Sequence, residues 1–99
     1  MVINWSNYAQ ENLEEFLKIT KIQDTDKYID DLFHYIELII DNNEIRKFFI
    51  NFNGYKIRQL IFNKHKIMYY IKDNEIRILA LIHSSQNFIS AFNKMLKYI

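Results

Sequence analysis

The 99-residue sequence contains no cysteine, no proline and a single glycine, Gly54. Without cysteine the chain has no disulfide framework, no thiolate nucleophile and no Cys-ligated zinc or iron–sulfur site. A single glycine excludes a glycine-rich phosphate-binding loop. The apolar run from Ile76 to Ile82 is interrupted by Arg77 and falls far below the ~18 residues that a membrane span needs. Enzymes that depend on thiols, metal–sulfur centres or phosphate loops are therefore excluded.

The three histidines, His34, His65 and His83, have no short metal-ligand spacing, so we expect neither a metal nor another cofactor. Hydrophobic residues make up 49% of the chain, which excludes intrinsic disorder. The length supports one modest core, and we expect a single domain over residues 1–99. The first residues lack the basic stretch and apolar core of a signal peptide, which predicts a cytoplasmic protein without membrane attachment.

The net charge of +1 is a cancellation between two oppositely charged halves. Residues 1–45 carry ten acids and three lysines, a net charge of −7. Residues 46–99 carry ten bases and two acids, a net charge of +8. Such an asymmetry within one domain is typical of a surface that faces a polyanion. The alternative is that the two halves attract each other within the fold.

The acidic half predicts a short strand and two helices. Val2 to Trp5 is a short apolar segment, and Ser6 favours a helix N-cap. From Asn7 to about Thr20, apolar residues recur at helical spacing. Asp24 and Thr25 offer the next cap, for a second amphipathic helix that reaches about Asn42. The short link between the helices predicts an antiparallel hairpin.

The basic half predicts strands and a last helix. Residues 44–53 fit either a strand or a buried loop, and three clearer strands follow at Tyr55 to Phe62, Lys66 to Lys72 and Glu75 to His83. Asp73-Asn74 suits a two-residue hairpin turn because both residue types tolerate positive φ. Together these elements predict an α+β domain, in which a short N-terminal strand and a helical hairpin pack on a twisted, mainly antiparallel sheet with a C-terminal helix.

Alternation along the last two strands assigns their two faces. The predicted core face carries Ile67, Tyr69, Ile71, Ile76, Ile78, Ala80 and Ile82. The opposite face is a mixture of basic and apolar residues: Lys66, Met68, Tyr70, Lys72, Arg77, Leu79, Leu81 and His83. Ser84 and Ser85 are the predicted caps of the last helix, whose apolar stripe is Phe88, Ile89, Phe92, Met95, Leu96 and Ile99.

Basic residues gather around the turn that joins the strands beginning at Tyr55 and Lys66. Clustered cations spaced by aromatic rings suit a phosphate backbone with bases stacked beside it. Lys56 and Arg58 project to one face, and a three-residue loop would bring Lys66 and Tyr70 onto that face, whereas a two-residue loop would not. The alternative is that these cations only protect exposed strands from aggregation. The candidate target-binding residues are Lys56, Arg58, Lys64, His65, Lys66, Tyr70 and Arg77.

Five short segments in this order resemble the RelE/ParE superfamily of bacterial toxins, from Val2 to about Asn87. They are Ile3-Asn4-Trp5-Ser6, Arg58-Gln59-Leu60, Lys66-Ile67-Met68-Tyr69, Ile76-Arg77-Ile78-Leu79 and His83-Ser84-Ser85-Gln86-Asn87. The resemblance implies the toxin of a type II toxin–antitoxin module, of the kind associated with plasmid stabilisation. Its implied partner is a cognate antitoxin whose C-terminal segment wraps around the helical hairpin and sheet, and a heterotetramer is one assembly that this allows.

The superfamily divides into two mechanisms. In mRNA-cleaving, ribosome-dependent members, basic residues bind the scissile phosphate, and Lys56, Arg58 and Lys66 match those positions, with His83 as a further catalytic candidate. Ser85-Gln86 stands where such members carry an arginine, and no catalytic Tyr or His follows shortly after. The segment from His83 to Asn87 fits the ParE-like pattern, which implies inhibition of DNA gyrase.

We therefore expect a gyrase-binding toxin. The alternatives are a ribosome-dependent mRNA endonuclease and an inactive relative that binds only an antitoxin. Two residues also have structural interpretations: His83 as a strand-end imidazole bonded to the backbone, and Arg58 in a core-facing ion pair.

Overall fold

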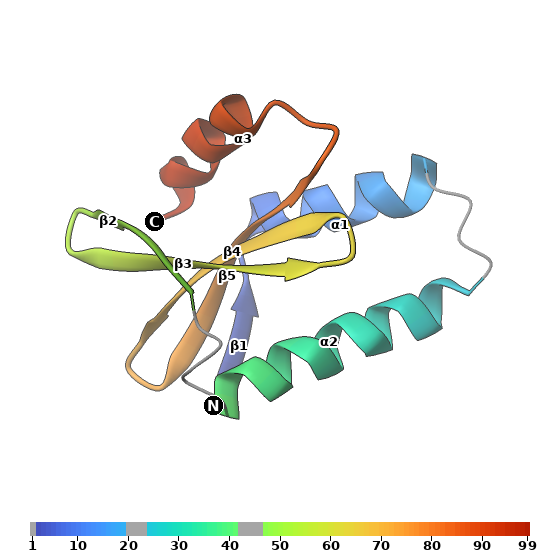
Figure 1. Ribbon diagram of the computed structural model, residues 1–99, viewed down its shortest axis with the longest axis horizontal. Helices are drawn as coiled ribbons and strands as arrows, with labels where there is room; N and C mark the ends of the chain where they lie inside the picture. Colours follow the sequence, from blue (N-terminus) through green and yellow to red (C-terminus); the bar gives the residue numbers. More distant parts are fainter. Residues whose placement is uncertain (1, 20–23, 42–46) are drawn as a thin grey trace.

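The computed structural model describes residues 2–19, 24–41 and 47–99 (Figure 1). It confirms the predicted α+β class, with helices on both sides of a five-stranded sheet. The elements are β1 (Val2–Trp5), α1 (Asn7–Ile19), α2 (Thr25–Asp41), β2 (Lys47–Phe52), β3 (Tyr55–Phe62), β4 (His65–Lys72), β5 (Glu75–His83), α3 (Phe88–Met95) and the 3₁₀ turn η2 (Leu96–Tyr98). The predicted helix ends at Thr20 and Asn42, and residues 44–46, lie outside the described residues.

The strand order is β1-β5-β4-β3-β2, so β4 occupies the centre of the sheet. β1 pairs with β5 in parallel, and all other neighbours are antiparallel. The hairpins close through two-residue turns at Asn53-Gly54, Asn63-Lys64 and Asp73-Asn74. Asp73 and Asn74 have φ of 52° and 59°, as the sequence predicted, because Asn and Asp tolerate the left-handed region better than most residues.

A β-bulge between β4 and β5 corrects the predicted assignment of faces. Met68 pairs with Ala80 and Tyr69 pairs with Ile78, so Leu79 is the extra residue on β5. One extra residue reverses the alternation beyond it. Ala80 and Ile82 therefore lie on the face that α3 covers, whereas Leu81 packs on the face that α1 and α2 cover.

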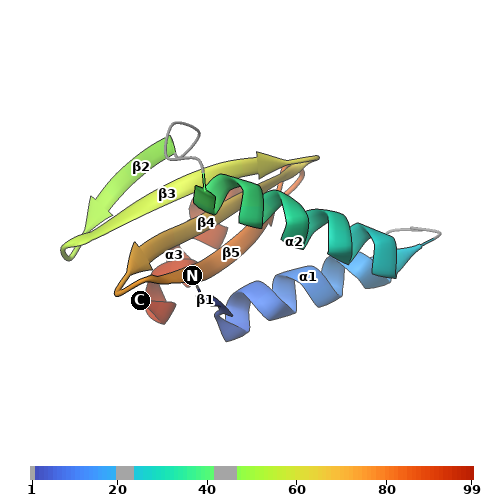
Figure 2. The ribbon, with the colours of Figure 1, turned by 90° about the horizontal axis from the view of Figure 1, so that it is seen from below.

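Both faces of the sheet are buried, in contrast to the mixed outer face that the sequence predicted. On one face, Ala9 of α1 and Leu32 and Ile36 of α2 pack against residues of β3, β4 and β5. The helix α3 lies on the other face (Figure 2). Its Ala91 and Met95 cover a second apolar cluster. Its members in the sheet are Ile57, Met68, Tyr70, Leu79, Ala80 and Ile82. The last helix therefore covers the second of the two apolar clusters.

Side chains at the start of α1 bind the backbone groups of β5 that do not pair with β1. β1 pairs only as far as Ile78, and the next polar groups of β5 are bound by the start of α1. Ser6 Oγ donates to the carbonyl of Leu79 at 2.9 Å, and it accepts from the backbone N–H of Ala9 at 3.0 Å as the predicted helix N-cap. The side chain of Asn12 accepts from the N–H of Leu81 at 3.1 Å.

Of the cap predictions for the other two helices, one is confirmed and one is wrong. Asp24 caps α2, because its Oδ1 accepts from the N–H of Lys27 at 2.9 Å. Asn87 caps α3, through a bond of 3.0 Å from the N–H of Ser90, so the prediction of Ser84 or Ser85 as the cap is wrong. Ile89, which the sequence predicted in the apolar stripe of this helix, is 72% exposed. None of the helices described is long and apolar enough to cross a membrane.

His65 is buried where the hairpin of helices meets the sheet. Its ring meets Phe16 of α1 edge to face at 4.3 Å between centroids, and its Nδ1 lies 3.4 Å from the hydroxyl of Tyr28 on α2. Burial, and to a smaller extent the neighbouring His83, lower the pKa of His65 to about 4. The neutral imidazole is thus part of the core at neutral pH.

The first prediction concerns Ser6, which joins α1 to β5. Ser6→Ala removes the N-cap and leaves the buried carbonyl of Leu79 without this donor, so we expect a loss of about 1–2 kcal/mol in the free energy of unfolding. Urea unfolding followed by circular dichroism measures it. Ser90→Ala, on the exposed side of α3, is the matched control and should stay within about 0.5 kcal/mol of the wild type. Equal effects of the two substitutions would contradict this role.

The second prediction concerns pH. In the unfolded chain His65 titrates near its ordinary pKa of ~6.5, so between pH 6.5 and 4 the unfolded state binds the extra proton. The stability that neutral His65 contributes is therefore complete above pH 6.5 and is lost as the pH falls toward 4. We expect His65→Phe to remove about 2 kcal/mol of the stability difference between pH 7 and pH 4.5.

Urea unfolding at the two pH values measures that difference. His34→Gln changes an exposed histidine of α2 and should keep the wild-type pH dependence. The role of His65 would be refuted if the His65→Phe variant lost as much free energy of unfolding between pH 7 and 4.5 as the wild type does.

Candidate functional site

The turn between β3 and β4 decides which basic residues share a face. The turn has two residues, with Phe62 paired to His65 and Asn63 at φ 53°. Arg58 therefore pairs with Tyr69 on the face of α1 and α2, whereas Lys66 pairs with Ile61 on the face of α3. Of the two loop lengths that the sequence left open, the shorter one occurs. Lys66 and Tyr70 are consequently separated by the sheet from Lys56 and Arg58.

The β-bulge separates His83 from Lys66 as well. His83 pairs with His65, and the two rings lie 5.0 Å apart between centroids on the side of the helical hairpin. The predicted alternation places His83 and Lys66 on a common face, but the extra residue at Leu79 prevents this. His65 is only 4% exposed, so this target-binding candidate is a core residue in the structure.

The imidazole of His83 is held by the loop that follows it. Its Nδ1 accepts from the backbone N–H of Ser85 at 3.1 Å, and the hydroxyl of Ser85 lies 2.7 Å from the same nitrogen. A nitrogen that accepts an N–H carries no proton, which assigns the proton of the neutral ring to Nε2. This geometry agrees with the interpretation of His83 as a strand-end imidazole bonded to the backbone.

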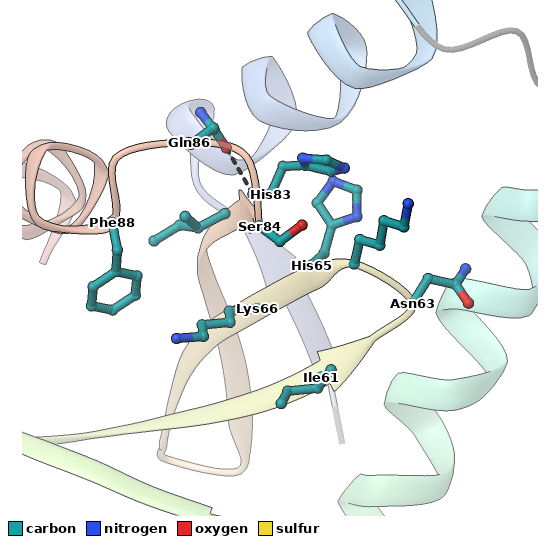
Figure 3. Close-up of a pocket in the computed structure, with 10 residues that line it drawn as sticks. Ile61, Asn63, His65, Lys66, His83, Ser84, Gln86 and Phe88 are labelled. Carbon is teal, nitrogen blue, oxygen red and sulfur yellow. Dashed lines mark hydrogen bonds between the residues drawn. The ribbon is translucent and has the colours of Figure 1, made fainter.

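A hollow of about 330 Å³ lies on the α3 side of the sheet, between the β3–β4 turn and the loop from β5 to α3 (Figure 3). Apolar side chains of Ile61, Ile82 and Phe88 contribute to it, and Lys64 and Lys66 are its cationic residues. The Nζ of Lys66 lies 4.6 Å from the centre of the Phe88 ring, a cation–π contact. The hollow can therefore hold an anionic group beside a flat apolar one.

The loop that borders this hollow is held by two hydrogen bonds that backbone N–H groups donate. Ser84 donates its N–H to the carbonyl of Lys64 at 2.8 Å, which ties the β5 end to the β3–β4 turn. Gln86 accepts from the N–H of His83 at 2.7 Å through its Oε1 (Figure 3). The residues of the segment His83 to Asn87 thus shape the loop, the hollow and the start of α3.

A second hollow of about 400 Å³ lies at the other end of β4, and the sequence analysis did not identify it as a site. Tyr55 and Tyr70 pack with ring centroids 4.8 Å apart, and the Nζ of Lys72 lies 5.2 Å from the Tyr55 ring. Lys56 also lines this hollow. The alternation Lys66, Met68, Tyr70, Lys72 on one face was the signal available in the sequence.

Arg77, another target-binding candidate, is engaged in the sheet. It forms an ion pair with Glu75 at 3.0 Å, and Asn4 of β1 donates to the same carboxylate oxygen at 2.6 Å. The bond from Asn4 and then that from Arg77 lower the pKa of Glu75. Glu75, held by Arg77 on its own strand, therefore joins β5 to the parallel strand β1 through Asn4.

Ion pairs within the fold do not neutralise the opposite charges of the two halves of the chain. Within the described ranges, the ion pairs are Lys27–Asp31 on α2 and Arg77–Glu75 on β5, so neither joins the acidic half to the basic half. The same parts of the chain contain no group of three or more His, Asp or Glu side chains that could hold a metal ion. In the basic half, a partner can reach the exposed lysines Lys56, Lys64, Lys66, Lys72, Lys94 and Lys97.

Comparisons with known proteins agree with this fold. A structure of the chromosomal ParDE toxin–antitoxin system of P. aeruginosa matches with a TM-score of 0.60 and 17% identity, over 84% of this chain and 95% of that one. The YoeB dimer of Staphylococcus aureus matches with a TM-score of 0.57 and 22% identity, over the same shares of the two chains. No curated protein sequence matches this chain.

A match to a protein-family model identifies the family of this chain. The model for the ParE toxin of the type II toxin–antitoxin system parDE matches residues 3–88, from the second residue of β1 to the first residue of α3. This confirms the resemblance to RelE/ParE toxins that the five sequence segments indicated. The chain therefore belongs to the ParE toxin family of type II toxin–antitoxin systems.

Proposed function

We propose that this toxin arrests growth by binding DNA gyrase and that a cognate antitoxin neutralises it. The observation that carries the proposal is the separation of the residues that a nuclease would need to bring together. Lys66 lies on the α3 face, whereas Arg58 and His83 lie on the opposite face. Catalysis at one phosphate requires cations and a proton-transfer group within a few ångström of each other. This arrangement favours a binding toxin over an mRNA endonuclease.

The residues after β5 support the same choice. Nδ1 of His83 is occupied by the N–H of Ser85, and the next aromatic residues are Phe88 and Phe92, which cannot transfer a proton. The family match adds support, because ParE-like toxins are the branch for which gyrase inhibition is expected. A target-binding surface then needs only exposed cations and apolar contacts, and Lys56, Lys64 and Lys66 are exposed.

The antitoxin is proposed to cover the helical hairpin. Two large apolar side chains of α2 are exposed, Phe33 at 41% and Leu38 at 53%. The two helices of the hairpin also expose acidic residues: Glu11, Glu14, Glu15, Asp26, Asp30 and Glu37. Exposed apolar side chains within an acidic surface suit an amphipathic partner segment with basic residues. A complex with two copies of each protein remains part of this proposal.

The third prediction is a gyrase assay with the purified chain. At stoichiometric excess the toxin should block supercoiling of relaxed plasmid or stabilise cleaved DNA, and prior addition of its antitoxin should prevent this. The Ser90→Ala variant, altered on the exposed side of α3, should retain the effect if that position lies outside the target surface. Full supercoiling activity at a tenfold molar excess of folded toxin would overturn the proposal.

The fourth prediction separates the rival activity. The lysine pair at the 330 Å³ hollow is the observation that favours an mRNA endonuclease. For a gyrase inhibitor, primer extension on translated messages after induction should show no codon-phased cuts. Cuts that appear with the wild type and disappear in the Arg58→Ala, Lys66→Ala double variant would establish the endonuclease instead. Expression without any growth arrest would indicate an inactive relative that binds only the antitoxin.

A further inference from the structure

Three side chains form a row across the α3 face of the sheet, beside the loop that leads into α3. Lys66 of β4 pairs with Ile61 of β3 on one side and with Ile82 of β5 on the other. Ile82 is buried, whereas Lys66 is exposed and Ile61 is 59% exposed. The half-buried ring of Phe88 lies beside the row, with its centre 4.6 Å from the Nζ of Lys66 (Figure 3). All four residues line the hollow of about 330 Å³, and the exposed Ile61 keeps it open to a partner.

Hydrogen bonds around the hollow fix its shape before a partner arrives. The N–H of Ser84 donates to the carbonyl of Lys64 at 2.8 Å, which holds the loop after β5 against the β3–β4 turn. The side chain of Asn87 accepts from the N–H of Ser90 at 3.0 Å, which fixes the start of α3 and with it Phe88. A surface that is already ordered loses less conformational entropy on binding.

We infer that this hollow is the gyrase contact of the toxin, and that it accepts a segment of gyrase in which a bulky aliphatic side chain stands next to a carboxylate. The aliphatic group would pack on Ile61 and Phe88, and the carboxylate would face the ammonium of Lys66. This inference rests on the proposed function and deepens it, because it names the contact surface and the chemistry of the segment that it binds.

The charges at the hollow favour an acidic partner. Among the described residues that line it, none is acidic, and Lys64 in the adjoining turn is a second exposed lysine. Neither of the two ion pairs within the described ranges involves Lys66, so its ammonium is available to a carboxylate. The surrounding basic half of the chain carries a net charge of +8, which attracts an acidic segment over a longer range.

The packing of Phe88 favours a protein segment over a nucleotide in this hollow. A nucleobase binds such a site by stacking its flat face on an aromatic ring. The Phe88 ring already stacks on Phe92, with centroids 5.8 Å apart, and it carries the Nζ of Lys66. A base would have to displace one of these contacts, whereas an aliphatic side chain can pack on Ile61 and the exposed edge of the hollow without doing so.

The fifth prediction compares two exposed isoleucines in the supercoiling assay. Ile61→Ser should raise the toxin concentration for half-inhibition of gyrase by about tenfold, because it removes an apolar contact of the interface. Ile89→Ser is the matched control, since Ile89 is 72% exposed on α3 but does not line the hollow. Its half-inhibition should stay within about twofold of the wild type. Circular dichroism checks that both variants are folded.

A second set of variants tests the charge. Lys66→Glu should raise the concentration for half-inhibition by about tenfold or more, because a carboxylate of gyrase would then face a like charge. Lys66→Arg keeps the charge and should stay within about threefold of the wild type. Lys18→Glu makes the same change in net charge on the helical hairpin and should inhibit as the wild type does. Equal losses in Lys18→Glu and Lys66→Glu would reduce the effect to net charge and overturn the site.

The remaining outcomes separate this inference from the proposed function. If the wild type inhibits gyrase and the Ile61→Ser and Lys66→Glu variants inhibit it equally well, the contact lies elsewhere and gyrase inhibition stands. If the folded wild type does not inhibit gyrase, both proposals are wrong. A labelled oligonucleotide that binds the toxin without gyrase, and loses this binding with Lys66→Glu but not with Lys18→Glu, would overturn the protein segment and assign the hollow to a nucleic acid.

Discussion

The pairing of β4 with β5, with one extra residue at Leu79, is the constraint on which the rest of the structure depends. With regular pairing continued from Lys72 and Glu75, His83 would fall on the face of Lys66, and Ile82 would fall opposite His65. Because of the bulge, His83 pairs with His65 and Ile82 pairs with Lys66. The bulge therefore completes the second core beneath α3 with Ala80 and Ile82, and it places His83 against the aromatic core of the helical hairpin.

The two-residue turn between β3 and β4 also determines which residues share a face of the sheet. Because Asn63 adopts a positive φ, Phe62 pairs with His65 and the basic residues of β3 and β4 alternate out of phase. The residues that could have formed one catalytic group are thereby divided between two faces. The same division places Lys66 and Lys72 on the face of α3, where Lys66 lies over the Phe88 ring and Lys72 over the Tyr55 ring. Backbone register, more than residue type, determines what the surface can bind.

The sequence predicted those parts of the fold that depend on local chemistry. Ser6 and Asp24 were identified as caps, Asp73-Asn74 as a turn, and β3, β4 and β5 to within one residue, because capping oxygens, positive-φ residues and β-branched runs act over a few residues. The bulge at Leu79 could not be predicted, since it is fixed by packing on both faces at once. Asn87 was missed because Ser84 and Ser85, which precede it, are equally favoured cap residues.

The candidate site was predictable in composition but not in arrangement. The sequence identified Lys56, Arg58, Lys64 and Lys66 as a basic group, yet their assignment to faces depended on one residue of loop length. The charge split has the clearer outcome, because both ion pairs among the described residues stay within their own half. Since salt bridges between the halves are missing from that set, the hairpin keeps its negative field and the sheet its positive one. A toxin with this field can present opposite surfaces to an antitoxin and to a target.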